Sequence, residues 1–207
     1  DVSEISAGGD MSCAVVGNDL QCWGLNENGQ VGDGTDVDRN IPVPVKGISG
    51  NIESVAVGRY HTCAITSGKI SCWGYNSHGQ LVNGEKYGDS FSPVEVNGLG
   101  GNAQVAVAGQ YHTCALTDEG TVFCWGNNDE GQLGDGTLED RTTPDQVSGL
   151  NGVTTLAAGW DHTCAATESG VFCWGENSYG QLGDGTTIDK VTPVLVKISS
   201  SAVLEGV

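Results

Sequence analysis

One pattern of about 50 residues occurs four times in tandem along the 207-residue chain. The second to fourth copies share His-Thr-Cys-Ala, then Cys-Trp-Gly-x-Asn, then Gly-Gln-Leu, whereas the first copy has Met11 and Ser12 in place of His and Thr. Tandem repeats of this length indicate stacked supersecondary units. The copies start near Val2, Ile52, Ala103 and Val153.

Each copy contains four short strand patterns. In the second copy, an apolar segment from Ser54 to Val57 leads into a strand around 62–66, and a third strand follows from Lys69 to Trp73. A long polar loop then precedes a Pro-Val segment, such as Pro42 to Val45 in the first copy or Pro193 to Val196 in the fourth. Four antiparallel strands per repeat are typical of a propeller blade. We predict an all-β β-propeller built of four-stranded antiparallel blades at about residues 2–50, 52–101, 103–151 and 153–198, with a C-terminal tail at 199–207.

Each copy carries two cysteines, and the strand register places them opposite each other. In the second copy a two-residue turn at Ser67 and Gly68 sets Cys63 directly across from Cys72. The third copy has one residue more, and a three-residue loop at 118–120 restores the opposition. Opposed positions of this kind have the Cα separation of a disulfide. We predict four disulfides within blades: Cys13–Cys22, Cys63–Cys72, Cys114–Cys124 and Cys164–Cys173.

Zinc sites and free core thiols are the two alternatives to this pairing. Zinc ligands usually come as pairs two to four residues apart, whereas these cysteines stand singly on separate strands. Unpaired thiols would need the same coincidence in every copy. A disulfide in each repeat requires an oxidising compartment, which predicts an extracellular or cell-surface location.

The order of these motifs resembles the repeat of the regulator of chromosome condensation family, in its cysteine-containing secreted variety. The resemblance runs from His-Thr-Cys-Ala to Gly-Gln-Leu-Gly-Asp-Gly-Thr and a later Pro-Val, and covers nearly the whole chain. It implies a propeller whose rings commonly hold about seven blades. The family's nuclear member promotes nucleotide exchange on a small GTPase and docks on chromatin. We expect neither activity here, because the charge opposes chromatin and disulfides do not suit that compartment.

The resemblance implies structural roles for the repeated residues, and their chemistry supports the same roles. The tryptophans should pack between blades, and the histidines should have a structural role rather than bind a ligand or metal. The glutamines should hydrogen-bond neighbouring backbone, and the glycines should adopt positive φ. These residues are Trp23, Trp73, Trp125 and Trp174; His61, His112 and His162; Gln30, Gln80, Gln132 and Gln181; and Gly34, Gly84, Gly136 and Gly185.

The chain is strongly acidic, with 26 Asp and Glu residues against 8 Lys and Arg residues and a formal net charge of −18. Nucleic acids and anionic membrane surfaces attract basic clusters, so this balance excludes both as partners. Membrane insertion is also excluded, because no apolar run approaches the roughly 20 residues of a helical span. The expected partner is a protein, either another copy of the chain or an extracellular protein.

No copy contains a unique set of catalytic groups, so we expect neither an enzyme nor a cofactor. The acidic loops beginning at Asp33, Asp135 and Asp184 raise the question of calcium. They lack the alternating spacing of a calcium loop, and the second copy has Asn83-Gly-Glu-Lys in that place. Turns in which the Asp side chain bonds its own backbone are the expected structure, so no metal site is predicted.

Positions that vary between equivalent turns are the candidates for recognition. One row precedes the second strand of each copy, and a second row follows Cys-Trp-Gly. Both rows contain aromatic or Arg residues, which interfaces favour, although ordinary turn variability is the alternative. The predicted binding residues are Arg59, Tyr60, Gln110, Tyr111, Trp160, Asp161, His78 and Tyr179.

Four blades are fewer than the family's usual ring, and uncovered end blades would pair with something or aggregate. The sequence is then part of a longer chain, or another copy completes the ring, or blades stack head to tail in an open assembly. We expect a secreted or cell-surface interaction or structural module that self-assembles through its terminal blades into an oligomer or filament. The alternative is a propeller inhibitor or ligand-binding protein that uses variable turns on one face, as a secreted bacterial β-lactamase inhibitor of this superfamily does.

Overall fold

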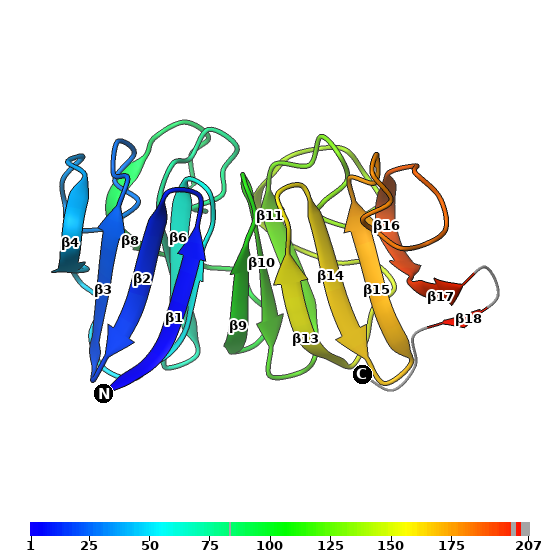
Figure 1. Cartoon of the computed structure of the whole chain (residues 1–207), viewed down its shortest axis with the longest axis horizontal. Coiled ribbons are helices and arrows are strands. Elements are labelled where there is room, and N and C mark those ends of the chain that lie inside the picture. The colour runs from blue at the N-terminus through cyan, green and yellow to red at the C-terminus, as the bar shows by residue number, and fades with distance from the viewer. Residues whose placement is uncertain (83, 200–201, 204–207) are drawn as a thin grey trace.

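The computed structural model describes residues 1–82, 84–199 and 202–203, and in it each repeat forms one four-stranded antiparallel sheet with its strands in chain order (Figure 1). The first two sheets contain β1 (Val2–Gly8), β2 (Met11–Val16), β3 (Asp19–Gly24) and β4 (Arg39–Pro44), then β5 (Ile52–Val57), β6 (His61–Thr66), β7 (Lys69–Gly74) and β8 (Ser90–Glu95). The last two contain β9 (Ala103–Ala108), β10 (His112–Thr117), β11 (Val122–Gly126) and β12 (Arg141–Gln146), then β13 (Val153–Ala158), β14 (His162–Thr167), β15 (Gly170–Gly175) and β16 (Lys190–Leu195).

The four sheets are the blades of a propeller, and they follow one another in an arc with the first and fourth blades at its ends (Figure 1). The first strand of each blade packs against the first strand of the next, from β1 through β5 and β9 to β13. None of the elements in the described ranges is a helix, so none of them is a helical membrane span. Residues 200–201 and 204–207 of the predicted tail lie outside the described residues. Near this end of the chain, β17 (Lys197–Ser199) pairs with β18 (Ala202–Val203).

The predicted disulfides are confirmed in all four blades. Cys63 pairs with Cys72 in the register that the two-residue turn requires, and the loop ending at Gly120, with φ of 73°, restores it for Cys114 and Cys124. The Cα atoms of each bonded pair lie 4.1 Å apart. No cysteine is free.

The outermost strand of each blade begins earlier than the Pro-Val segment predicts. In the first blade it starts at Arg39 rather than Pro42, because the backbone of Arg39 pairs with Gly24 across a bulge that shifts the register. The residues between, Asn40 and Ile41, are both exposed, so no alternation of buried apolar side chains marks the strand.

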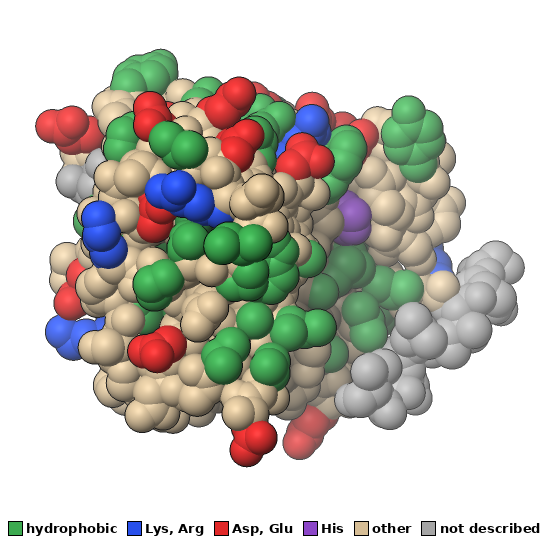
Figure 2. Space-filling model, turned by 60° about the vertical axis from the view of Figure 1, so that its left-hand side comes forward, with side chains coloured by type: hydrophobic (Ala, Val, Ile, Leu, Met, Phe, Trp, Pro, Cys, Tyr) green, Lys and Arg blue, Asp and Glu red, His purple; other side chains and the backbone are tan. Residues whose placement is uncertain are grey.

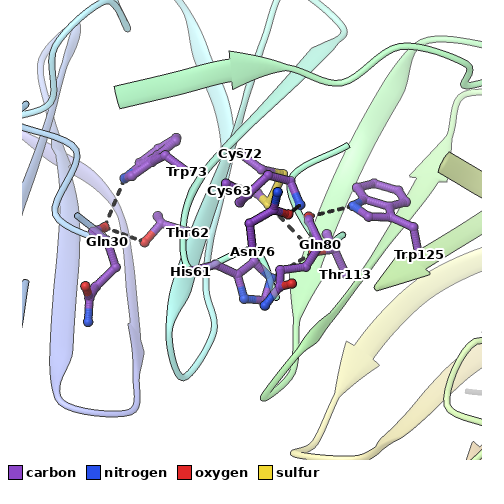
Figure 3. The surroundings of a disulfide bond; sticks show 11 residues. Gln30, His61, Thr62, Cys63, Cys72, Trp73, Asn76, Gln80, Thr113 and Trp125 are labelled. Carbon is purple, nitrogen blue, oxygen red and sulfur yellow. Dashed lines mark hydrogen bonds between the residues drawn. A yellow bond between two sulfur atoms is a disulfide. The ribbon is translucent and has the colours of Figure 1, made fainter. Parts of the chain in front are cut away.

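Each junction between blades is closed by one main-chain carbonyl, that of the glutamine in the Gly-Gln motif (Figure 3). The Gln80 carbonyl accepts a hydrogen bond from Trp125 Nε1 at 2.8 Å, and Gln30 and Gln132 do the same for Trp73 and Trp174 at 2.9 Å. These three tryptophans are fully buried, which confirms their predicted packing between blades. The glutamine side chains bond backbone N–H groups two residues earlier in the loop, as predicted, and their acceptor atoms are Oε1 of Gln30, Gln80, Gln132 and Gln181.

A histidine and a threonine complete the later junctions. His112 Nε2 lies 3.0 Å from Thr163 Oγ1, and that hydroxyl also lies 3.0 Å from the Gln132 carbonyl. Because the carbonyl can only accept, Thr163 donates to it, and His112 Nε2 therefore carries a proton and donates to the Thr163 hydroxyl. His61 and Thr113 form the same contact at 2.8 Å. Burial lowers the pKa of His61 to about 4, and burial together with the neighbouring histidines lowers that of His112 to about 3.

Replacing Trp125 by phenylalanine should destabilise the protein. Phenylalanine lacks both the indole N–H and the second ring, so the Gln80 carbonyl loses this buried donor and a small cavity is left. We expect a loss of at least about 1 to 3 kcal/mol in the free energy of unfolding, measured by urea denaturation. Tyr179→Phe is the control, because Tyr179 is 91% exposed and should leave stability unchanged. Equal stability of Trp125→Phe and wild type would show that this hydrogen bond contributes nothing.

Acid should weaken the fold through the buried histidines. Their pKa values are lowered in the folded state, so between pH 6.5 and 4 the unfolded chain binds more protons and stability falls as the pH falls. The free energy of unfolding should fall by about 3 kcal/mol per histidine over this pH range. The first blade has buried Met11 at this position, so a His61→Met, His112→Met variant should fold and show a flatter dependence over this range. An unchanged slope in pH-dependent urea unfolding would contradict the assignment.

Candidate protein-binding face

The predicted turns before the second strand of each blade lie side by side at one end of the propeller axis. The backbone N–H of Arg59 donates to the Gly109 carbonyl at 3.1 Å, and that of Gln110 donates to the Trp160 carbonyl at 2.8 Å. Each turn is thereby fixed to the next blade. A cavity of about 200 Å³ lies where they meet, lined by the corresponding turns of all four blades, with Arg59 and Trp160 among its walls.

Four ring side chains from the second and third blades form a cluster beside these turns. Tyr60 stacks on Tyr111 with ring centroids 5.4 Å apart and planes 15° apart. Tyr75 lies 6.0 Å from Tyr60 and 5.7 Å from Tyr111, and the His78 ring lies 5.1 Å from Tyr111. All four are partly exposed, so the cluster presents aromatic surface to solvent.

Arg59 connects this cluster to the fourth blade. Its guanidinium carbon lies 5.1 Å from the centroid of the Tyr60 ring and 4.9 Å from that of Trp160. Both contacts have cation–π geometry. Trp160 is 65% exposed, so most of its indole remains in solvent although it contacts the Arg59 guanidinium. We call Arg59, Tyr60, Tyr75, His78, Tyr111, Trp160 and Asp161 the turn face.

Carboxylates border the turn face on the side of the third and fourth blades. Burial and the neighbouring Glu176 raise the pKa of Asp161, although Arg59 opposes the shift. Burial and repulsion from Asp189, Glu176 and Asp161 likewise raise the pKa of Glu130. The main-chain carbonyl of Asp161 accepts a hydrogen bond from the Glu176 N–H at 2.8 Å, which holds these two residues together. Negative charge is therefore concentrated beside Trp160.

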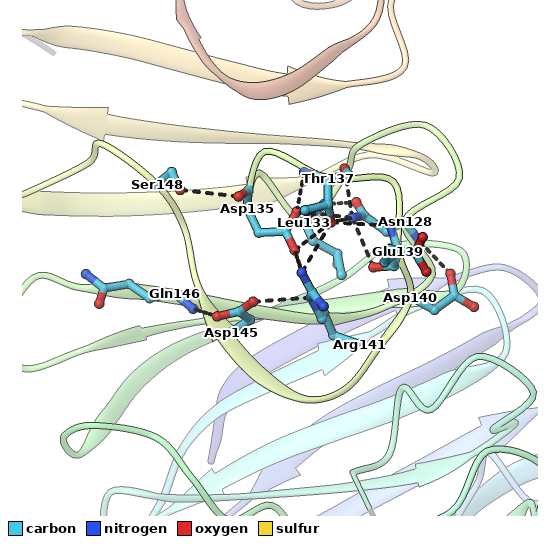
Figure 4. A network of polar contacts seen from close by, with 10 residues as sticks. All are labelled: Asn128, Leu133, Asp135, Thr137, Glu139, Asp140, Arg141, Asp145, Gln146 and Ser148. Atoms are coloured by element: carbon cyan, nitrogen blue, oxygen red, sulfur yellow. Dashed lines mark hydrogen bonds and ion pairs between the residues drawn. The ribbon is translucent and has the colours of Figure 1, made fainter.

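His78 is held in place from the opposite side of the cluster. Its Nδ1 lies 3.0 Å from an Asp140 oxygen, and Lys86 Nζ lies 2.9 Å from the same oxygen. The other Asp140 oxygen accepts the Asn128 N–H at 2.9 Å (Figure 4). Burial raises the pKa of the Asp140 carboxyl, but the hydrogen bonds from Lys86 and His78 outweigh it and lower the pKa. The His78 ring is thus fixed against Tyr111.

The acidic loops have the predicted Asp turns. Asp135 Oδ1 accepts the Thr137 N–H at 2.8 Å, and Arg141 Nε lies 2.8 Å from Asp135 Oδ2 (Figure 4). The equivalent carboxylates, Asp33 and Asp184, bond their own Thr backbone in the same way and pair with Arg39 and Lys190. A basic side chain thus occupies each carboxylate that raised the question of calcium. The glycines after these residues adopt positive φ as predicted: Gly34, Gly136 and Gly185, with Gly84 in the second blade.

The structure brings together six of the eight predicted binding residues and leaves two apart. Arg59, Tyr60, Tyr111, Trp160, Asp161 and His78 form most of the turn face. Gln110 is half-buried and contributes its backbone N–H, and Tyr179 projects into solvent with no ring partner among the described residues. Tyr75 and Glu176 were missed. They occupy the variable position of Cys-Trp-Gly-x-Asn, where the copies have Leu25, Tyr75, Asn127 and Glu176.

The family model for the RCC1-like domain matches residues 1–206, and the chain belongs to this family of propellers. The Arabidopsis thaliana ultraviolet-B receptor UVR8 is 38% identical over 169 residues, which is 79% of this chain and 38% of the receptor. The mitochondrial RCC1 domain-containing protein RUG3 of the same plant is 32% identical over 178 residues, or 80% of this chain and 40% of RUG3. This chain therefore spans less than half the length of these relatives.

Solved structures agree with the fold. Human WBSCR16 superposes with a TM-score of 0.86 and 26% identity over 95% of this chain and 53% of that one. Yeast RCC1 (Prp20), solved bound to Kap60, superposes with a TM-score of 0.84 and 20% identity over 97% of this chain and 50% of that one. The yeast likeness extends to the fold alone.

Proposed function

We propose that this chain is an extracellular protein-interaction module without a catalytic role, and that its turn face binds the partner. The observation that carries the proposal is the convergence of aromatic side chains from three blades on one face. Tyr60, Tyr111 and Trp160 occupy variable turn positions, yet their turns are joined by backbone hydrogen bonds. Rigid exposed aromatics of this kind dominate binding energy at protein interfaces.

The family and the disulfides support this proposal. Yeast RCC1 (Prp20), which shares the fold, binds the protein Kap60. All eight cysteines form disulfides, and disulfides persist in oxidising compartments such as the extracellular space. RUG3 shows that relatives also occur in mitochondria, so the disulfides rather than the family carry the extracellular assignment. The buried His61 and His112 are occupied within blade junctions, where they are unsuited to act on a substrate.

Peptides that bind the turn face should lose affinity when its aromatic residues are removed. Random peptides displayed on phage and selected on the wild-type protein should bind at least about tenfold more weakly to Trp160→Ala and to Tyr111→Ala. Tyr179→Ala is the matched control, because Tyr179 is an equally exposed aromatic outside the face. Melting temperatures check that each variant folds. Selected peptides that bind all three variants like wild type would refute the proposal.

A second candidate function is self-association through the end blades. Ile5 in the first blade is 76% exposed, whereas Val55 and Leu156, which occupy the same repeat position, are buried against the preceding blade. Figure 2 is turned so that the first-blade side of the molecule faces the viewer, and hydrophobic side chains gather there beside a hollow. At the other end, His162 is half-buried and its ring has no threonine partner among the described residues. The two ends thus have the complementary halves of a blade junction.

Head-to-tail association predicts that the 207-residue chain forms concentration-dependent oligomers in sedimentation velocity. Ile5→Glu should shift the distribution to monomer, because a carboxylate would be buried in the new junction. Leu138→Glu is the control, since Leu138 is 57% exposed on a loop of an interior blade. A wild-type chain that stays monomeric at high concentration would exclude this candidate and leave the turn face unaffected.

A further inference from the structure

The packing of Arg59 shows how the turn face accommodates a guanidinium. This side chain lies between two rings, with its charge 5.1 Å from the Tyr60 centroid and 4.9 Å from the Trp160 centroid. Trp160 remains 65% exposed in spite of this contact. The indole therefore keeps accessible aromatic surface to which a second planar cation can bind.

The carboxylates beside Trp160 form no ion pair among the described residues, whereas Asp33, Asp135 and Asp184 in the outer loops each pair with a basic side chain. Five of the eight Lys and Arg residues form ion pairs away from Trp160, namely Arg39, Lys69, Lys86, Arg141 and Lys190. Two more, Lys46 and Lys197, lie over glycines of the outer loops. Arg59 is the one basic residue that acts on Asp161, while Glu130 and Glu176 have no ion pair among the described residues.

We propose that the turn face binds an arginine-rich segment of the partner protein, with an arginine stacked on Trp160 and paired with the carboxylates of Asp161 and Glu176. This inference rests on the proposed function and specifies the partner's chemistry. The Asp161 carbonyl bonds the Glu176 N–H at 2.8 Å, so Glu176 lies beside the residue that directly follows Trp160 in the turn, and the two carboxylates are close enough to repel each other. A guanidinium satisfies both requirements at once, because its plane stacks on rings while its N–H groups point at carboxylates.

Other ligand classes suit this surface less well. A phosphate or an acidic segment would meet Asp129, Glu130, Asp161, Glu176 and Asp189, whose charges would repel it. A lysine segment would gain the charge attraction, but an ammonium cannot stack as a plane or form two parallel hydrogen bonds. A purely apolar segment would leave the carboxylates buried without partners.

The test uses a fluorescein-labelled nonapeptide of alternating Arg and Gly, titrated with the whole chain and followed by fluorescence anisotropy at about 150 mM salt, where long-range attraction is screened. Trp160→Ala and the double variant Asp161→Asn, Glu176→Gln should each weaken binding about tenfold. A second labelled nonapeptide, in which Lys replaces each Arg (the Lys-Gly peptide), should bind several-fold more weakly than the Arg-Gly peptide.

A matched control separates a specific site from general attraction to an acidic protein. Glu119→Gln, Glu168→Gln removes the same charge from exposed hairpin turns at the opposite ends of the strands, and it should change affinity less than about twofold. An equal loss in this variant, or equal binding of the Lys-Gly peptide, would overturn the arginine site. If phage-selected peptides still require Trp160 in that case, the proposed interaction face stands and only its partner's chemistry is wrong. If neither kind of peptide depends on Trp160, both proposals fail.

Discussion

The glutamine carbonyl at each blade junction is the contact on which the rest of the propeller depends. It accepts an indole N–H and a threonine hydroxyl from the next blade, as Gln132 does from Trp174 and Thr163. A carbonyl has two lone pairs, so these two donors satisfy it completely. The histidine adds a bond to the threonine and is not essential for closure. Where Met11 replaces it, Thr62 still donates to the Gln30 carbonyl at 2.8 Å.

This closure separates the positions that hold the fold from the positions that are free to vary. The repeated Trp, Thr and Gln residues make their contacts inside the junctions, while the turns at the axis are joined by backbone hydrogen bonds, such as that from the Gln110 N–H to the Trp160 carbonyl. A backbone bond does not depend on the side chain of either residue. The turns can therefore have different side chains in each blade at fixed geometry, which is what a recognition surface on a repeat protein requires.

The sequence predicted most of the fold because hairpin geometry is local. Counting across the turn at Ser67 and Gly68 was enough to place Cys63 opposite Cys72, and one register determines the first three strands of a blade. The outermost strands were placed late, since a bulge, rather than an apolar alternation, sets where Arg39 pairs. The turn face was predicted in part. Tyr75 was missed because its closeness to Tyr60 arises from the bond between the Tyr75 N–H and the Tyr60 carbonyl, and Tyr179 was included although its turn directs it into solvent.

Carboxylates of this acidic chain have opposite electrostatic environments in its two kinds of loop. Burial disfavours charge on Asp184 in an outer loop, but hydrogen bonds from Thr186 and the nearby Lys190 reverse the effect and lower its pKa. Burial also disfavours charge on Asp161, and there the neighbouring Glu176 adds to the effect and raises the pKa. Asp184 is thus stabilised in its charged form within the chain, while the residues beside Trp160 retain repulsion that a cation from outside would relieve. This repulsion also acts between two blades, because Glu130 of the third blade is repelled by Asp161, Glu176 and Asp189 of the fourth.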